Sequence, residues 1–289
     1  MIRSISFRTG ATTVPLEMDE AGRGRSIVLL PALSSISTRN EMSPLLAQLS
    51  RSFRVRSVDW PGFGDLAKPK ADWGPDLLSD FLAWFLGSLD GGPHVVVAAG
   101  HAATYALHHQ FHHPGAICSL AMIAPTWRGP LPTMMGGRRP WFGNIRSAVD
   151  APVAGTLLYA LNMSGPVVRR MARAHVYEQP GEAFEIRLAA KRNVTSARGA
   201  RFASVRFVTG ALDRVDDRDA FLDLARTAGI PLLNLFGDGT PPKSRAEMEA
   251  LAALPFVETV RLPHGKLALH EEYPEEIASE LNGWIAGKP

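Results

Sequence analysis

The chain has 289 residues, with 31 Lys and Arg against 28 Asp and Glu, 46% hydrophobic residues and one cysteine. This composition excludes collagen, a coiled coil and a disordered chain. The basic residues follow no nucleic-acid-binding motif, so we expect no nucleic-acid partner. The lone Cys118 cannot form an internal disulfide, which fits a reducing compartment.

Neither a membrane span nor a secretory signal is expected. No apolar stretch approaches the roughly 18 residues of a transmembrane helix, and the first residues lack the apolar core of a signal peptide. We therefore expect a cytoplasmic protein. The sequence leaves its oligomeric state open.

Short apolar runs alternate along the chain with longer helical patterns, which is typical of a parallel sheet covered by helices on both faces. The expected strands are residues 27–30, 53–58, 95–99, 120–124, 231–236 and 259–262. The expected helices, with apolar residues three and four apart, are residues 41–50, 77–89, 102–112, 245–254 and 274–286. The predicted fold class is α/β, with a mostly parallel, doubly wound sheet.

Residues 127–229 interrupt this alternation. The segment opens with the Gly/Pro-rich stretch RGPLP at 128–132 and continues as a helical pattern with few strand-like runs. We predict a mainly helical cap at 127–229, inserted into a core made of 1–126 and 230–289. Ligands of such sheets bind beyond the carboxyl ends of the strands, so the loops there are the expected site.

Four motifs in these loops and helices resemble those of the α/β-hydrolase superfamily along nearly the whole chain. They are DWPGFG at 59–64, PHVVVAAGHA at 93–102, His113-Pro114, and HEEYP at 270–274. The resemblance implies the α/β-hydrolase fold with a helical cap. It also implies a strand, a sharp turn bearing a nucleophile in a G-x-S-x-G pattern, and a helix.

The resemblance places other residues where the family has its Ser-His-Asp triad. The nucleophile position falls on Gly100, or on Ala102 if the register is shifted to match a G-H-S string. The acid position falls on Thr240 and the histidine position on Leu267. None of these side chains can perform its counterpart's role in the triad.

The family's oxyanion loop is also altered, because its usual H-G reads Pro31-Ala32 here. Pro31 has no backbone donor. The backbone amides of Leu33 and His101 remain as expected donors to a developing negative charge.

Replacement catalytic groups have both a functional and a structural interpretation. His101 follows the turn and is our first acid/base candidate, although this side chain often packs away from the pocket; His264 is a weaker one. Ser34 and Ser35 are nucleophiles only if a base lies within reach, and such serines more often satisfy loop backbone groups. Asp238 takes the place of the triad's acid if its loop follows a different path from the family's loop.

Further candidates line the expected pocket without a defined role. Thr126 and Trp127 follow the strand at 120–124, and the arginines of the cap either attract an anion or form a solvated face. We interpret Asp59 as a structural residue of its turn and the histidines at 108–113 as a solvated helix end. We expect no metal and no cofactor.

Three functions remain open. The first is a capped pocket for a small, mostly apolar ligand, with or without an anionic group, where non-covalent acid/base chemistry of a lyase, isomerase or hydratase type takes place. The second is a catalytically silent protein that binds a ligand or partner. The third is a hydrolase with a relocated triad made of Ser34 or Ser35, His264 and Asp238.

Overall fold

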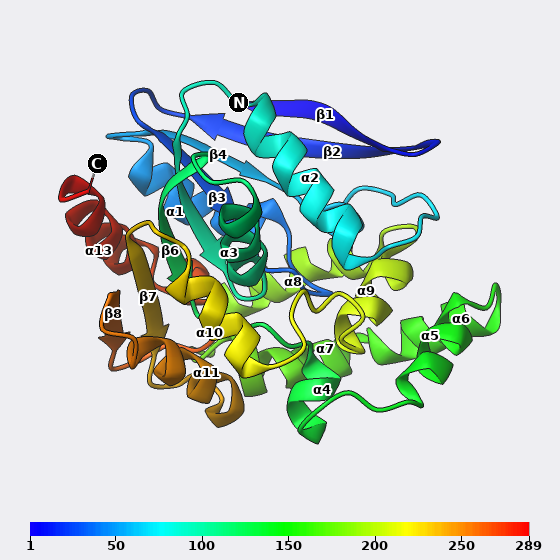
Figure 1. Ribbon diagram of the computed structural model, residues 1–289. Helices are drawn as coiled ribbons and strands as arrows, with labels where there is room; N and C mark the ends of the chain where they lie inside the picture. Colours follow the sequence, from blue (N-terminus) through cyan, green and yellow to red (C-terminus); the bar gives the residue numbers. More distant parts are fainter. Residues whose placement is uncertain (289) are drawn as a thin grey trace.

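The computed structural model describes residues 1–288, which form an eight-stranded sheet flanked by helices (Figure 1). The strand order is β1-β2-β4-β3-β5-β6-β7-β8. β1 and β2 form an antiparallel hairpin, β2 pairs antiparallel with β4, and every other pairing is parallel. The strands are β1 Ile2–Thr9, β2 Thr12–Ala21, β3 Ser26–Leu30, β4 Arg54–Val58, β5 His94–Ala99, β6 Ile117–Ile123, β7 Leu232–Gly237 and β8 Val257–Leu262. This architecture confirms the predicted α/β fold class.

Two helical layers cover the central strands, whose side chains alternate between the faces. In β3, Val28 and Leu30 pack into one hydrophobic cluster, while Ile27 and Leu29 pack into the other. The first cluster lies under α2 (Pro75–Ser88), α3 (Ala102–His112) and α10 (Arg218–Arg226). The second lies under α1 (Ser43–Leu49) and α13 (Pro274–Ala286). α11 (Pro242–Ala252) contributes to both clusters. The apolar runs are continuous because both faces are buried.

Most predicted elements agree with the structure to within three residues. α3 and α13 have the predicted bounds, whereas α2 and α11 begin earlier, each with a proline in the first turn. Proline suits that position because its missing amide would have no helical partner. The hairpin of β1 and β2 precedes the first predicted strand. Only one side of it is apolar, with Val14, Leu16 and Met18 buried.

The helical insertion, as we call α4 to α9, follows β6 and lies to one side of the sheet in Figure 1, with α5 and α6 farthest from it. Its helices are α4 Pro130–Met135, α5 Phe142–Asp150, α6 Ala154–Asn162, α7 Gly165–Met171, a π-helical turn at Ala172–Val176, α8 Glu182–Ser196 and α9 Ala200–Val208. α10 also lies within the segment 127–229. Its buried Phe221 and Leu222 nevertheless join the cluster formed by the sheet and α3.

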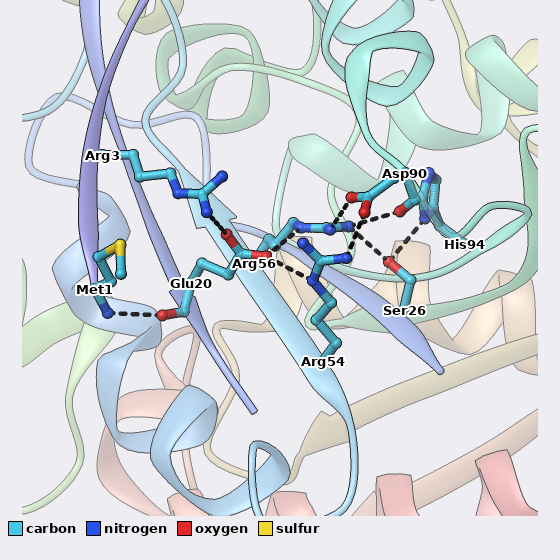
Figure 2. A network of polar contacts seen from close by, with 8 residues as sticks. All are labelled: Met1, Arg3, Glu20, Ser26, Arg54, Arg56, Asp90 and His94. Atoms are coloured by element: carbon cyan, nitrogen blue, oxygen red, sulfur yellow. Dashed lines mark hydrogen bonds and ion pairs between the residues drawn. The ribbon is translucent and has the colours of Figure 1, made fainter. Parts of the chain in front are cut away.

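A polar network ties the hairpin to the start of β3 (Figure 2). The buried Arg56 of β4 donates to Glu20 at 3.1 Å, to the hydroxyl of Ser26 at 3.1 Å and to the backbone oxygen of Asp90 at 2.9 Å. Arg54 also donates to Glu20. Burial raises the pKa of Glu20, but hydrogen bonds from the two arginines outweigh it, so this pKa lies below its ordinary value. A buried guanidinium is tolerated here because its donors are satisfied.

η1 (Arg39–Met42) and α12 (Leu269–Glu272) are short helices in the loops that follow β3 and β8. Because parallel strands end at the same edge of a sheet, these loops lie on the side of the turn after β5. That edge carries the residues predicted from the sequence.

Candidate functional site

The turn between β5 and α3 is formed by Gly100, whose φ is +51°. Its amide donates to the carbonyl of Ile123 at 2.8 Å, and its carbonyl accepts from the amide of Thr126 at 3.1 Å. A side chain at Gly100 would point between Ala32 and Thr126, since its Cβ would lie 3.3 Å from the Ala32 Cβ and 3.9 Å from the Thr126 hydroxyl. The turn, the loop after β3 and the loop after β6 therefore meet at one place.

Two backbone donors remain unused, one at the end of this turn and one on the loop after β3. The amides of Leu33 and His101 donate no hydrogen bond to any of residues 1–288, although both residues are buried. His101 is the residue before α3, so its amide has no helical acceptor. The neighbouring Ala32 amide is occupied, because it donates to Oε1 of Glu41 at 2.9 Å. The helix dipole of α3 adds positive potential here.

Thr240 and Leu267 lie on the loops that follow β7 and β8. The hydroxyl of Thr240 is buried and has no hydrogen-bond partner in the described chain. The two loops approach closely, since a side chain at Gly237 would collide with the carbonyl of His264. The amide of Leu267 donates to the carbonyl of His175 in the helical insertion at 3.4 Å. Threonine and leucine provide no charged group here.

The imidazole of His101 is 1% exposed and packs against the rings of Tyr105 and Phe207. Its Nε2 lies 3.4 Å from Oδ1 of Asp213. Burial lowers the pKa of His101 to about 4, and burial raises the pKa of Asp213 to about 7. The imidazole is therefore neutral near pH 7. The sequence singled out His101 but gave no sign of Asp213, which is 112 positions further on in the chain.

Ser34, Ser35, His264 and Asp238 make hydrogen bonds to other groups and none to one another. Ser34 bonds to the Ser37 hydroxyl at 2.8 Å, and Ser35 accepts from Ser204 at 2.6 Å. His264 Nε2 lies 2.7 Å from Glu276, and Asp238 accepts from Arg261 at 2.5 Å. This geometry does not assemble the three-residue arrangement of a relocated triad.

Trp127 and Asp59 are held by charged partners. The indole of Trp127 donates to Glu247 at 2.9 Å, and the guanidinium of Arg128 stacks on its ring. Asp59 accepts from the amide and the guanidinium of Arg39, both at 2.7 Å. Both residues thus fix the loops around the turn after β5.

A buried ionic cluster joins the helical insertion to the loop after β3. The ammonium of Lys191 in α8 lies 3.2 Å from Oε2 of Glu41 and 3.2 Å from Oε2 of Glu271. The hydroxyl of Tyr177 donates to the same Glu271 oxygen at 2.6 Å. His270 Nε2 lies 3.6 Å from Oε1 of Glu41. We call these five residues the Lys191 cluster.

Charges in the Lys191 cluster stabilise one another. Burial raises the pKa of Glu41, but the ammonium of Lys191 and then His270 outweigh it, so this pKa lies well below its usual value. Burial opposes the charge of Lys191, yet the two carboxylates raise the pKa of this ammonium above its ordinary value. In the sequence, His270 and Glu271 stand out only as parts of the HEEYP motif at 270–274. Their position before Tyr273-Pro274 was the one available signal.

The sequence of the chain matches a known protein family. Residues 27–280 match the model of the alpha/beta hydrolase family. The chain belongs to the alpha/beta hydrolase family. No curated protein matches its sequence.

Solved structures of other alpha/beta hydrolases have the same fold over their full length. A serine hydrolase involved in carbazole degradation is 15% identical, with a TM-score of 0.73 and 99% of both chains covered. A thermophilic esterase from Thermogutta terrifontis is 20% identical, with a TM-score of 0.74 and 98% of both chains covered. The haloalkane dehalogenase DatA from Agrobacterium tumefaciens C58 is 17% identical, with a TM-score of 0.70 and coverage of 99% and 97%.

Two further features of this alpha/beta hydrolase concern metals and membranes. Among residues 1–288, no group of three or more His, Cys, Asp or Glu side chains is arranged to hold a metal ion. Within the same range, no helix combines the length and apolar character needed to cross a membrane.

His108 and His112 face each other near the end of α3, and His108 accepts from Arg214 at 3.0 Å.

Proposed function

We propose that this alpha/beta hydrolase family member binds a small, mostly apolar molecule at the turn after β5 through a carbonyl or carboxylate oxygen, without forming a covalent intermediate. We call this place the elbow site; it comprises Gly100, Ala32, Thr126 and the amides of Leu33 and His101. Thr240 and Leu267 are the proposed lining residues from the neighbouring loops.

The unused amides at a glycine turn are the observation that carries the proposal. A buried backbone donor without a partner costs about 1–3 kcal/mol, and the amides of Leu33 and His101 both have this property. An oxygen that accepted from both would remove the cost. An electronegative oxygen also suits the N-terminal end of α3.

The absence of a nucleophilic atom supports binding without covalent attack. Gly100 has no side chain, and the nearest hydroxyl, that of Thr126, lies 3.9 Å from where its Cβ would be. Threonine needs an adjacent base to become a nucleophile. The imidazole of His101 instead faces Asp213, and that of His264 faces Glu276.

The elbow site is tested with two probes. A fluorophosphonate should leave every serine of the protein unlabelled. Phenylacetate should shift the backbone amide resonances of Leu33 and His101 in nuclear magnetic resonance spectra, because its carboxylate accepts from them. A labelled serine, or a titration that leaves both resonances unmoved, would overturn the proposal.

Proton transfer at the elbow site is a second proposal, which the contact between His101 and Asp213 favours. A buried carboxyl group with a raised pKa beside a neutral imidazole is a common acid/base arrangement. Phenylacetone in deuterated water is the probe: the two amides would polarise its carbonyl, and His101 would take the α-proton once its ring turns from Asp213 toward the elbow site. Exchange faster than in buffer, and lost in His101→Gln, supports this proposal. Exchange at the buffer rate indicates a silent binding protein.

A further inference from the structure

A cavity of about 660 Å³ lies away from the elbow site, where the loop after β4 meets the helical insertion. Its walls are the segment 68–70, one side of α6, and the turn between α8 and α9. The amide of Lys68 donates to the carbonyl of Arg198 at 2.8 Å and so joins two of these walls. The volume is in the range of small-molecule sites, roughly 300–1,000 Å³.

The lining of this cavity is strongly basic. Its charged lining residues are Lys68, Lys70, Arg198 and Arg201, and among residues 1–288 no Asp or Glu lines it. None of the four forms an ion pair with a carboxylate within the part of the chain that the structure describes. The remaining lining side chains are polar or apolar without charge. Four cationic side chains around one cavity make its potential positive.

Lys68 lines the cavity and carries a buried ammonium group. Its side chain is 6% exposed and donates to the carbonyl of Gly64. Burial lowers the pKa of this ammonium to about 8, against the attraction of Asp59 and Asp65. A buried cation is costly unless it is paired. An anion in the cavity would add to the attraction of Asp59 and Asp65 for this ammonium.

The uncharged part of the lining combines hydroxyl-bearing residues with apolar ones. Tyr159, Met163 and Phe202 line the cavity. The hydroxyl of Tyr159 is buried beside Ser204 without a hydrogen bond of normal geometry. The guanidinium of Arg201 donates to the carbonyl of Pro152, so it is fixed at the rim. Apolar walls with a few convergent polar groups are typical of ligand sites.

We propose that this cavity is a second binding site, for an apolar small molecule that carries a single anionic group such as a carboxylate or sulfonate. The anionic group lies among the four basic side chains, and the apolar body lies against Tyr159, Met163 and Phe202. This site is independent of the elbow site, since none of the elbow-site residues lines the cavity.

The probe is 8-anilinonaphthalene-1-sulfonate, compared with N-phenyl-1-naphthylamine, which has the same rings without the sulfonate. The sulfonate should bind more tightly than the neutral amine, and its affinity should fall as salt is raised from about 50 to about 500 mM, because exposed charges are screened. The exposed pair K70A/R198A should weaken sulfonate binding roughly fivefold to tenfold. Binding of the neutral amine should change little.

Three variants locate the bound probe. R8A/R23A removes two exposed charges from the hairpin side of the molecule and should leave sulfonate binding unchanged. L157Q/L161Q removes two exposed leucines of α6, an alternative place for an apolar dye outside the cavity. Ala32→Phe fills the elbow site. Loss of binding in either of the last two variants, or equal affinity of K70A/R198A and the parent, would overturn the cavity site.

Discussion

The ammonium of Lys191 lies 3.2 Å from Oε2 of Glu41, and the other oxygen of this carboxylate accepts the amide of Ala32 at 2.9 Å. Glu41 therefore links a helix of the insertion to the residue beside the unused amide of Leu33. Glu41 also prevents the Ala32 amide from acting as a third donor at the elbow site. The position of the helical insertion and the shape of the oxyanion loop are coupled through one buried carboxylate.

Lys191→Met should strongly destabilise the protein. The variant leaves Glu41 and Glu271 buried without their shared cation. Removing one partner of a buried ion pair costs about 3–5 kcal/mol. Denaturant unfolding monitored by circular dichroism measures this change. Lys243→Met is the matched control, because that lysine is exposed and forms no ion pair with the described residues; it should change stability by less than about 0.5 kcal/mol.

A triple variant separates the loss of a charge pair from the loss of packing. In E41Q/K191M/E271Q no buried charge remains among these three residues, so much of the stability lost in Lys191→Met should return. If the triple variant is no more stable than Lys191→Met, uncompensated charge is not the cause of the destabilisation.

Acid should weaken the Lys191 cluster. The pKa of Glu41 is depressed in the folded state, so its contribution to stability is complete above the unfolded value of 4.5 and is lost as the pH falls from there through the folded pKa. The free energy of unfolding should therefore fall steeply below about pH 4.5. E41Q/K191M should show a shallower fall, with a residual slope because the pKa of Glu20 is also depressed. Parallel pH profiles for the two proteins would contradict this assignment.

Two arginines that contact Glu20 should differ greatly in their contribution to stability (Figure 2). Arg56 is 1% exposed and makes several hydrogen bonds, so Arg56→Met should cost about 3 kcal/mol or more. Arg3 is 52% exposed and lies 3.3 Å from the same carboxylate, so Arg3→Met should cost less than about 1 kcal/mol. Urea unfolding at pH 7 compares them. Equal effects would mean that burial does not set the contribution of this network.

The sequence predicts local features of this fold well because they depend on residues close together in the chain. The bounds of α3 and α13 follow from the spacing of their apolar residues, and the Val-rich run before Gly100 predicts β5. The start of α2 follows from Pro75, which the apolar spacing alone did not indicate.

Contacts between distant residues do not follow from local sequence patterns. Glu41, Lys191 and Glu271 are all charged, and charged residues are normally exposed. Only the folded chain brings them together. The surroundings of the His101 ring could not be predicted for the same reason. Its neighbours Phe207 and Asp213 belong to a segment whose path the local pattern did not define. The amides of Leu33 and His101 were expected from the resemblance to the family's oxyanion loop and not from any local pattern.

Restoring the family's catalytic side chains tests the alignment behind the elbow site. In G100S/T240D/L267H the introduced serine enters a turn with φ of +51°, and its Cβ needs Ala32 to move by a few tenths of an ångström. If Gly100, Thr240 and Leu267 occupy the three catalytic positions, this variant should react with a fluorophosphonate at the introduced serine and hydrolyse p-nitrophenyl acetate. G100S/T240D lacks the general base and should be roughly 100-fold slower. A folded triple variant without labelling would show that the three loops do not converge as proposed.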